Sequence, residues 1–109
     1  MPYDEDLANR IRELLAEERF TEQRMFGGLA FLVGGHISVA ASGDGGLLTR
    51  VPDDEYDAAI GELGVDEFVM RGRAMRGWLR VSADGVTAGA DLARWAARGV
   101  SVAKALPPK

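Results

Sequence analysis

The ionisable and nucleophilic residues of this chain form no pattern typical of an active site. The chain has one histidine, His36, and no cysteine, which excludes thiolate ligands, disulfides and a cysteine nucleophile. A metal site would therefore have to be built from carboxylates, and a serine triad would have to use His36, although no serine lies in a Gly-x-Ser-x-Gly segment. We expect no catalytic residue, no metal and no cofactor, and we interpret His36 as a solvated residue beside a tight turn.

The glycine-rich segments are interpreted as turns rather than as phosphate-binding loops. None has the spacing of a P-loop or of Gly-x-Gly-x-x-Gly, and they lead into predicted strands, whereas a phosphate-binding loop leads into a helix. The pair Gly34-Gly35 suits a two-residue hairpin turn, because glycine readily adopts the positive φ angles that such a turn requires.

The segment 71–80, RGRAMRGWLR, is the part of the chain whose residue types suggest binding, since it contains arginines and no acid. If residues 77–82 form a strand, Arg76, Trp78 and Arg80 share a face, where they could bind phosphate and stack on a base, or pair with an acidic partner. The favoured alternative is internal, with Arg76 and Arg80 enclosing Trp78 or pairing with acids of the helices, because the chain has 17 acidic and 13 basic residues. The candidate binding residues are Arg71, Arg73, Arg76, Trp78 and Arg80.

Overall charge and hydropathy narrow the class of protein. The net charge is −4, the wrong sign for a protein that coats nucleic acid or anionic lipid. The first ten residues are acidic where a signal peptide is basic, and no apolar run approaches the roughly 18 residues of a membrane span. We expect one domain over residues 1–109, located in the cytoplasm and away from membranes.

Apolar periodicity and turn signals predict helices at both ends of the chain and strands between them. The first predicted helix covers 4–18, with Phe20 packed beneath its end. The second covers about 53–63, with Leu63 on the buried stripe, and the third covers about 89–106, with a break or a bend at Gly99. The predicted strands cover 23–26, 29–33, 36–41, 47–51, 65–70 and 77–82, and residues 71–76 are a predicted loop. Strands in blocks favour an α+β fold of two layers, an antiparallel sheet of about five strands with helices packed on it, in the order α-β(3)-α-β(2)-α.

Several segments together resemble the N-terminal domain of the TfoX/Sxy family, which is named for bacterial regulators of natural competence. The resemblance rests on RMFGG at 24–28 with the apolar strand after it, the Gly-Gly hairpin, LLTRV at 47–51, and MRGWLRV at 75–81. It implies a two-layer fold like that of type III secretion chaperones, and it implies a short, single-domain member, because the sequence ends at Lys109 before the C-terminal domain of longer members. It transfers no catalytic residue. The residues of the structural motif are Arg24, Met25, Phe26, Gly27, Gly28, Gly34 and Gly35.

Three functions follow from these observations. The leading hypothesis is a non-enzymatic regulatory or interaction domain that contacts another protein or a second copy of itself. The second is nucleic-acid binding through the arginines and tryptophan of 71–80, with the acidic net charge against it. The third is an enzyme whose site, a carboxylate near His36 in a closed polar pocket, has no recognised motif.

Overall fold

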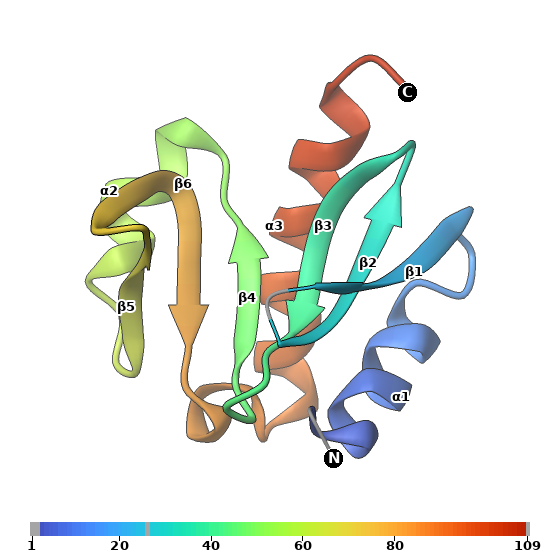
Figure 1. The fold of residues 1–109 in the computed structure, drawn as a ribbon, viewed down its shortest axis with the longest axis horizontal. Helices are drawn as coiled ribbons and strands as arrows, with labels where there is room; N and C mark the ends of the chain where they lie inside the picture. The colour runs from blue at the N-terminus through green and yellow to red at the C-terminus, as the bar shows by residue number, and fades with distance from the viewer. Residues whose placement is uncertain (1–2, 26, 109) are drawn as a thin grey trace.

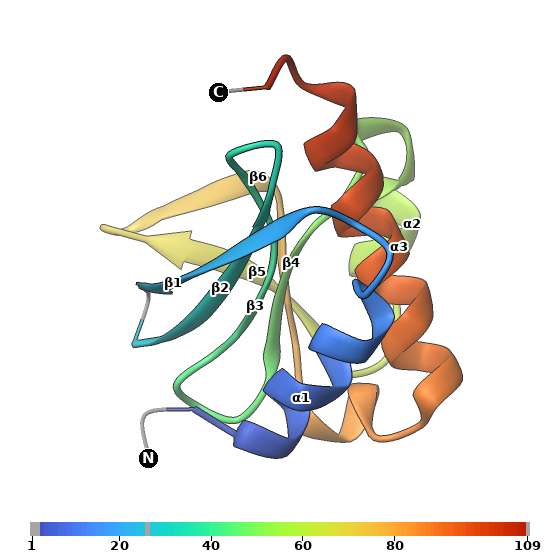
Figure 2. The same cartoon turned by 90° about the vertical axis from the view of Figure 1, so that its right-hand side faces the viewer.

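The fold is an antiparallel sheet of six strands with the helices on one face, as a computed structural model describing residues 3–25 and 27–108 shows (Figures 1 and 2). The strands lie in the order β1-β2-β3-β4-β6-β5. The predicted α+β class is confirmed. The strand predicted at 47–51 is present over 47–50, so the first block has four strands where the predicted order has three. The strands are β1 (Phe20–Met25), β2 (Gly28–Val33), β3 (His36–Ala41), β4 (Leu47–Arg50), β5 (Val65–Met70) and β6 (Arg73–Val81). The helices are α1 (Glu5–Leu14), α2 (Tyr56–Ile60) and α3 (Gly89–Ala105), with 3-10 turns η1 (Asp53–Glu55) and η2 (Ala83–Val86).

The first helix and strand differ in extent from the prediction. The side chain of Asp4 caps α1 by accepting hydrogen bonds from the backbone N–H groups of Asp6 and Leu7. The helix ends at Leu14 rather than at residue 18, and β1 begins at Phe20, which was expected to pack beneath the helix. The extended pairing from Phe20 onward places its ring 5.9 Å from that of Phe31, so aromatic packing accompanies the longer strand.

The helix-facing side of the sheet, here called the inner face, carries the main hydrophobic core. Phe31, Leu47 and Leu79 lie on it and are fully buried together with Ile11 of α1 and Trp95 of α3. Alternation along each strand produces this arrangement, because every second side chain points toward the helices. The helical spacing of Trp95 with Leu92 and Ala96 predicts a core residue, and Trp95 is buried.

The long helix α3 is continuous through Gly99, where a break or a bend was predicted. A Cβ atom at this position would collide with the carbonyl oxygen of Ser38 and lie 2.9 Å from Cγ1 of Val39. Ser38 occupies an irregularity in the pairing of β2 with β3, and its hydroxyl donates a 2.8 Å hydrogen bond to the carbonyl of Phe31. Gly99 therefore lets the helix approach β3 closely and does not bend it.

The predicted helix over 53–63 is much shorter in the structure. It consists of η1 followed by the five residues of α2, and Gly61 is its C-terminal cap. Leu63 lies beyond the helix and is 98% exposed, so its predicted place on the buried stripe was wrong. Glycine at 61 favours the early end because it is a poor residue for helix continuation, although its own φ of −81° is helical; the positive φ of 81° comes later, at Gly64.

The loop predicted over 71–76 is mostly strand, because β6 begins at Arg73 and pairs with β5 from there. The connection is a two-residue turn of Arg71 and Gly72, with φ angles of 55° and 78°. Two successive positive φ angles are typical of a tight hairpin turn whose twist matches that of the strands. The basic segment is consequently part of the sheet.

Candidate functional site

The candidate site is the face of the sheet away from the helices, here called the outer face (Figure 2). A second hydrophobic cluster, separate from the main core, lies on it. Three side chains of the cluster, Ala30, Ala40 and Leu48, are buried. Five larger ones pack against them and remain half-buried: Met25, Leu32, Ile37, Phe68 and Trp78.

The sequence places these side chains outward by alternation and by one irregularity in the β2–β3 pairing. On β4, Leu47 and Thr49 point inward, so Leu48 and Arg50 point outward. On β3, the irregularity near Ser38 allows Ile37 to join the outer cluster while Val39 joins the core. The outer face is thus produced by the same strands that build the core.

Arg50 and Trp78 form the polar edge of this cluster. They are direct partners in the β4–β6 pairing, and the guanidinium carbon of Arg50 lies over the indole ring at 4.8 Å from its centroid. This distance is within the range of a cation–π interaction. Phe68 completes the group, with its ring centroid 6.3 Å from that of Trp78.

The guanidinium group of Arg50 has no counter-charge among the residues that the structure describes. Its Nε atom is buried without a hydrogen-bond acceptor, and no residue within 3–25 and 27–108 forms an ion pair with it. Burial lowers the pKa of Arg50, because removing the cation from water disfavours the charged form. Arginine nevertheless stays protonated at neutral pH, so the outer face carries a partly dehydrated positive charge.

The predicted binding residues of segment 71–80 are divided between the two faces. Trp78 and Arg80 share the outer face, as predicted, because they alternate along β6 opposite Arg50 and Leu48. Arg76 does not share it. Gly77 has a φ angle of 93° and lies where the β5–β6 pairing is irregular, which interrupts the alternation.

Arg76 lies instead against the inner-side elements η1 and α2. Its Nε and Nη1 atoms bond to the carboxylates of Asp53 at 3.0 Å and Asp57 at 3.3 Å, and its guanidinium carbon lies 4.6 Å from the ring centroid of Tyr56. These hydrogen bonds raise the pKa of Arg76. The internal pairing foreseen as the alternative is therefore observed for this arginine.

The other arginines of the segment have different surroundings. Arg80 pairs with Asp44 in the turn before β4. Arg71 and Arg73, at the hairpin turn and the start of β6, are exposed and form no ion pair with any residue that the structure describes. The five predicted residues do not form one cluster.

Two residues of the outer site were not predicted, Arg50 and Phe68. Alternation already placed Arg50 on the face of Leu48, but the pairing of β4 with β6 brings Arg50 beside Trp78, and no local pattern encodes that pairing. Next to them the face is hollowed, with a depression of about 350 Å³ whose lining includes Ala40, Leu48, Phe68 and Arg80. The depression offers space for an apolar group close to the aromatic pair.

The motif residues near the first hairpin have structural roles. A Cβ atom on Gly28 would collide with the carbonyl oxygen of Ala41, so glycine permits the close approach of β2 to β3. Gly27, Gly34 and Gly35 have φ angles of 70°, 62° and 82°, which glycine adopts without strain. Of the remaining motif residues, Met25 belongs to the outer cluster, Arg24 is exposed, and Phe26 lies outside the described residues.

Among the residues that the structure describes, no carboxylate forms a hydrogen bond or an ion pair with His36. Its Nε2 atom lies 2.6 Å from the carbonyl oxygen of Pro107, so the histidine contacts the segment after α3 rather than water alone. A hydrogen bond from Arg12 lowers the pKa of Glu22, which is the opposite of what a general acid requires. Within the described part of the chain, no group of three or more metal-ligating side chains could hold a metal ion.

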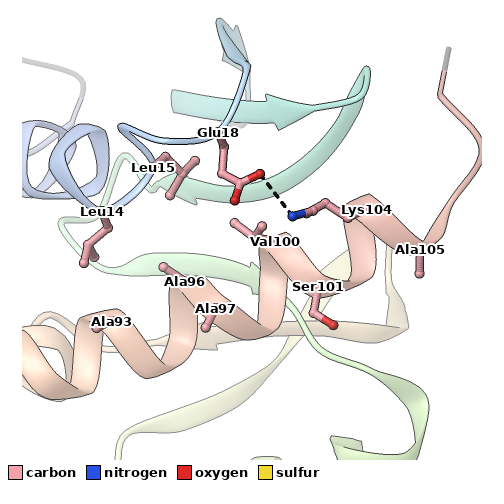
Figure 3. A pocket seen from close by; sticks show the side chains of 10 residues that line it. All are labelled: Leu14, Leu15, Glu18, Ala93, Ala96, Ala97, Val100, Ser101, Lys104 and Ala105. Atoms are coloured by element: carbon pink, nitrogen blue, oxygen red, sulfur yellow. Dashed lines mark ion pairs between the residues drawn. The ribbon is translucent and has the colours of Figure 1, made fainter.

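A separate groove of about 590 Å³ lies between the end of α1 and α3 (Figure 3). The ion pair of Glu18 with Lys104, at 3.4 Å, crosses it, and Leu14 lines it with 42% of its surface exposed. The α3 side presents small side chains, namely Ala93, Ala97 and Ser101. The two titratable side chains of the groove, Glu18 and Lys104, pair with each other.

Comparisons with known proteins give one match. The family model described as the TfoX N-terminal domain matches residues 13–103, which is nearly the whole chain. No curated protein and no solved structure matches the chain. No helix among the described residues has both the length and the apolarity needed to cross a membrane.

Proposed function

This chain belongs to the TfoX N-terminal domain family, and we propose that it is a non-catalytic regulatory domain that binds a protein partner on its outer face. The observation that carries this proposal is a half-buried cluster of large apolar side chains with no helix over it (Figure 2). Contiguous apolar surface on a small domain is a mark of an interaction site.

The residue types on the outer face support a protein partner. Methionine, aromatic residues and arginine are enriched at the centres of protein interfaces, and tryptophan and arginine dominate among residues that carry binding energy. Met25, Phe68 and Trp78 with Arg50 have this composition. The face has no perturbed acid–base pair, so the same observation favours binding over catalysis.

The proposal is tested by comparing two variants that each remove one large apolar side chain. Trp78→Ser removes the aromatic side chain that contacts Arg50 and Phe68 in the outer cluster, and Leu63→Ser removes a leucine that is 98% exposed and lies outside it. In affinity capture from the source cells with chemical crosslinking, Leu63→Ser should retain the partners of the unaltered protein and Trp78→Ser should lose them. Identical capture by both variants would show that binding occurs elsewhere.

Sedimentation velocity on the same proteins distinguishes a second copy from a different partner. If the unaltered protein forms a dimer that Trp78→Ser abolishes, self-association is the function of the face. Circular dichroism melting curves identify any loss of binding that results from unfolding. Both variants must retain a cooperative transition for the comparison to count.

Nucleic-acid binding is the second candidate, and the observation in its favour is the pair of exposed, unpaired arginines at the β5–β6 turn, Arg71 and Arg73. Arg76 and Arg80 are neutralised by Asp53, Asp57 and Asp44, which weakens this candidate. Fluorescence anisotropy with a labelled oligonucleotide should show binding that falls steeply with salt and is lost in the double variant R71A/R73A. No binding at low salt would eliminate it.

A further inference from the structure

Arg50 indicates the chemistry that a partner must bring to the outer face. Several other arginines in and around the sheet have acids of their own: Arg80 has Asp44, and Arg98 of α3 has Glu55 and Glu62. Arg24, Arg71 and Arg73 form no ion pair with a described residue but are exposed to solvent, whereas Arg50 is half-buried. Arg50 has the indole ring of Trp78 and apolar neighbours instead. Its buried Nε–H has no acceptor among the described residues.

A partly buried guanidinium group without a counter-charge destabilises the folded protein, and binding of an anion stabilises it. Burial removes water from the cation, and the lowered pKa of Arg50 has this desolvation as its cause, with no carboxylate to oppose it. The guanidinium carbon lies 4.8 Å from the centroid of the indole ring, and the N–H donors of a guanidinium form a planar fork that suits the two oxygens of a carboxylate. A carboxylate that arrived with a partner would bond to the Nη groups of Arg50 and would balance a charge that no described residue balances.

Building on the proposed function, we propose that the outer face binds a protein segment in which a carboxylate lies beside apolar side chains. The carboxylate bonds to Arg50, and the apolar side chains pack on Trp78 and Phe68 and enter the adjoining depression of about 350 Å³. Charge complementarity at Arg50 sets which segment is accepted, and apolar burial supplies most of the affinity.

Two other occupants fit the face less well. A nucleic acid would approach a chain with a net charge of −4, and Arg50 already lies over the indole ring on which a base would have to stack. A second copy that met the outer face with its own outer face would have to place an acid against Arg50. Asp66, an acid of the neighbouring strand β5, lies directly opposite Arg80, which already pairs with Asp44. Both occupants remain outcomes of the test below.

The test begins with selection of a random peptide display library on the unaltered protein. Selected peptides should combine aspartate or glutamate with apolar residues and should lose binding to Trp78→Ser. Two synthetic versions of a selected peptide are then prepared, one with its acid and one with the corresponding amide. Isothermal titration measures both versions against the unaltered protein, Arg50→Gln and Arg19→Gln.

The arginine controls separate a specific contact from general charge. Arg19 is exposed and forms no ion pair with a described residue, so Arg19→Gln removes the same charge from a place outside the outer face. Replacing the acid of the peptide by its amide should weaken binding by about tenfold or more in the unaltered protein and in Arg19→Gln. In Arg50→Gln the same replacement should change binding by less than about threefold, because the contact is already absent. Arg50→Lys, which keeps the charge without the forked donors, should give an intermediate loss.

The outcomes distinguish this inference from the function on which it rests. The inference is overturned and the proposed function stands if selected peptides depend on Trp78 but their acids can be replaced by amides without loss of affinity. The same conclusion follows if that replacement weakens binding to Arg50→Gln as much as binding to the unaltered protein. If no selected peptide depends on Trp78, both fail. A dimer or an oligonucleotide complex that depends on Arg50 would also overturn the inference, because it identifies a different occupant.

Discussion

At the scale of single residues, Arg50 combines a cost to folding with a use in binding. Its Nε–H is buried without an acceptor, and an unsatisfied buried donor destabilises the folded state. The cation–π contact with Trp78 offsets part of that cost. Surfaces that bind often retain such unfavourable groups because the partner satisfies them.

We expect Arg50→Met to leave the free energy of unfolding unchanged or to raise it by up to about 1 kcal/mol, because methionine fills similar space without an unsatisfied charge. Urea denaturation of the free protein measures the change. The same variant should bind selected acidic peptides more weakly. A clear loss of stability would show that Arg50 is held by interactions stronger than its contact with Trp78.

Gly99 is the second residue whose role is specific. Alanine is intrinsically better than glycine in a helix by about 1 kcal/mol. Gly99→Ala should nevertheless destabilise the protein by roughly 1–3 kcal/mol, because the added methyl group collides with the carbonyl of Ser38 and α3 must move. Gly89→Ala, where an added Cβ meets no atom within 4 Å, is the matched control and should be neutral or stabilising. Thermal melting of the two variants makes the comparison.

At the scale of elements, α1 and β1 are joined by an ion pair on the inner side. Nε of Arg12 lies 2.7 Å from Oε2 of Glu22, and this hydrogen bond lowers the pKa of Glu22 below its ordinary value of 4.5. A carboxyl with a lowered folded-state pKa stabilises the protein above its unfolded pKa, and that contribution is lost as the pH falls through the folded value. Both side chains are about one-third exposed, so the contribution is small.

The expected result for Glu22→Gln is a loss of at most about 1 kcal/mol at neutral pH. The difference from the unaltered protein should shrink as the pH falls below 4.5, because Glu22 then becomes protonated in both states. Denaturation at several pH values measures this, with Glu17→Gln as a control for an exposed acid without a described ion pair. A difference that does not depend on pH would show that the effect is not electrostatic.

The β5–β6 hairpin carries a residue poorly suited to its turn. Arg71 has a φ angle of 55°, which asparagine and glycine adopt more readily, and Gly72 follows it at 78°. Arg71→Asn would create the Asn-Gly pair favoured in such turns and should stabilise the protein by roughly 0.5–1 kcal/mol. Arg73→Asn, within β6, lacks this benefit and serves as the control in parallel melting experiments. Equal effects would indicate that loss of charge, not turn geometry, is responsible.

At the scale of the whole molecule, local patterns predicted the layers well and the site poorly. The alternation of 36–41 and the apolar run of 29–33 indicate strands from sequence alone, and the apolar spacing around Trp95 indicates a core helix. The α+β class followed from the order of such elements. The predicted extent of the second helix was wrong because apolar spacing does not reveal the low helix propensity of Gly61. The predicted path of 71–76 was wrong because apolar spacing does not reveal the positive φ angles of Arg71 and Gly72.

The candidate site was predicted only in part for a different reason. Trp78 and Arg80 were recognised by residue type, and their shared face followed from alternation. Arg76 was placed on the wrong face because an irregular pairing at Gly77 shifts the alternation. Arg50 and Phe68 were missed because their proximity to Trp78 depends on which strands become neighbours, and that is a property of the assembled sheet.

The strand order has a consequence for how the outer face comes into being as the chain folds. In the described sheet, β1 to β4 pair with their neighbours in sequence, and so do β5 and β6, whereas β4 joins β6 across the segment that contains η1, α2 and β5. Pairings between near neighbours close short loops and form early, and the β4–β6 pairing has a longer loop to close. Arg50 and Trp78 lie on opposite sides of that junction. The face that we propose as the binding site is thus completed only when the two halves of the sheet meet, so a partly folded chain would present each half of it without the other.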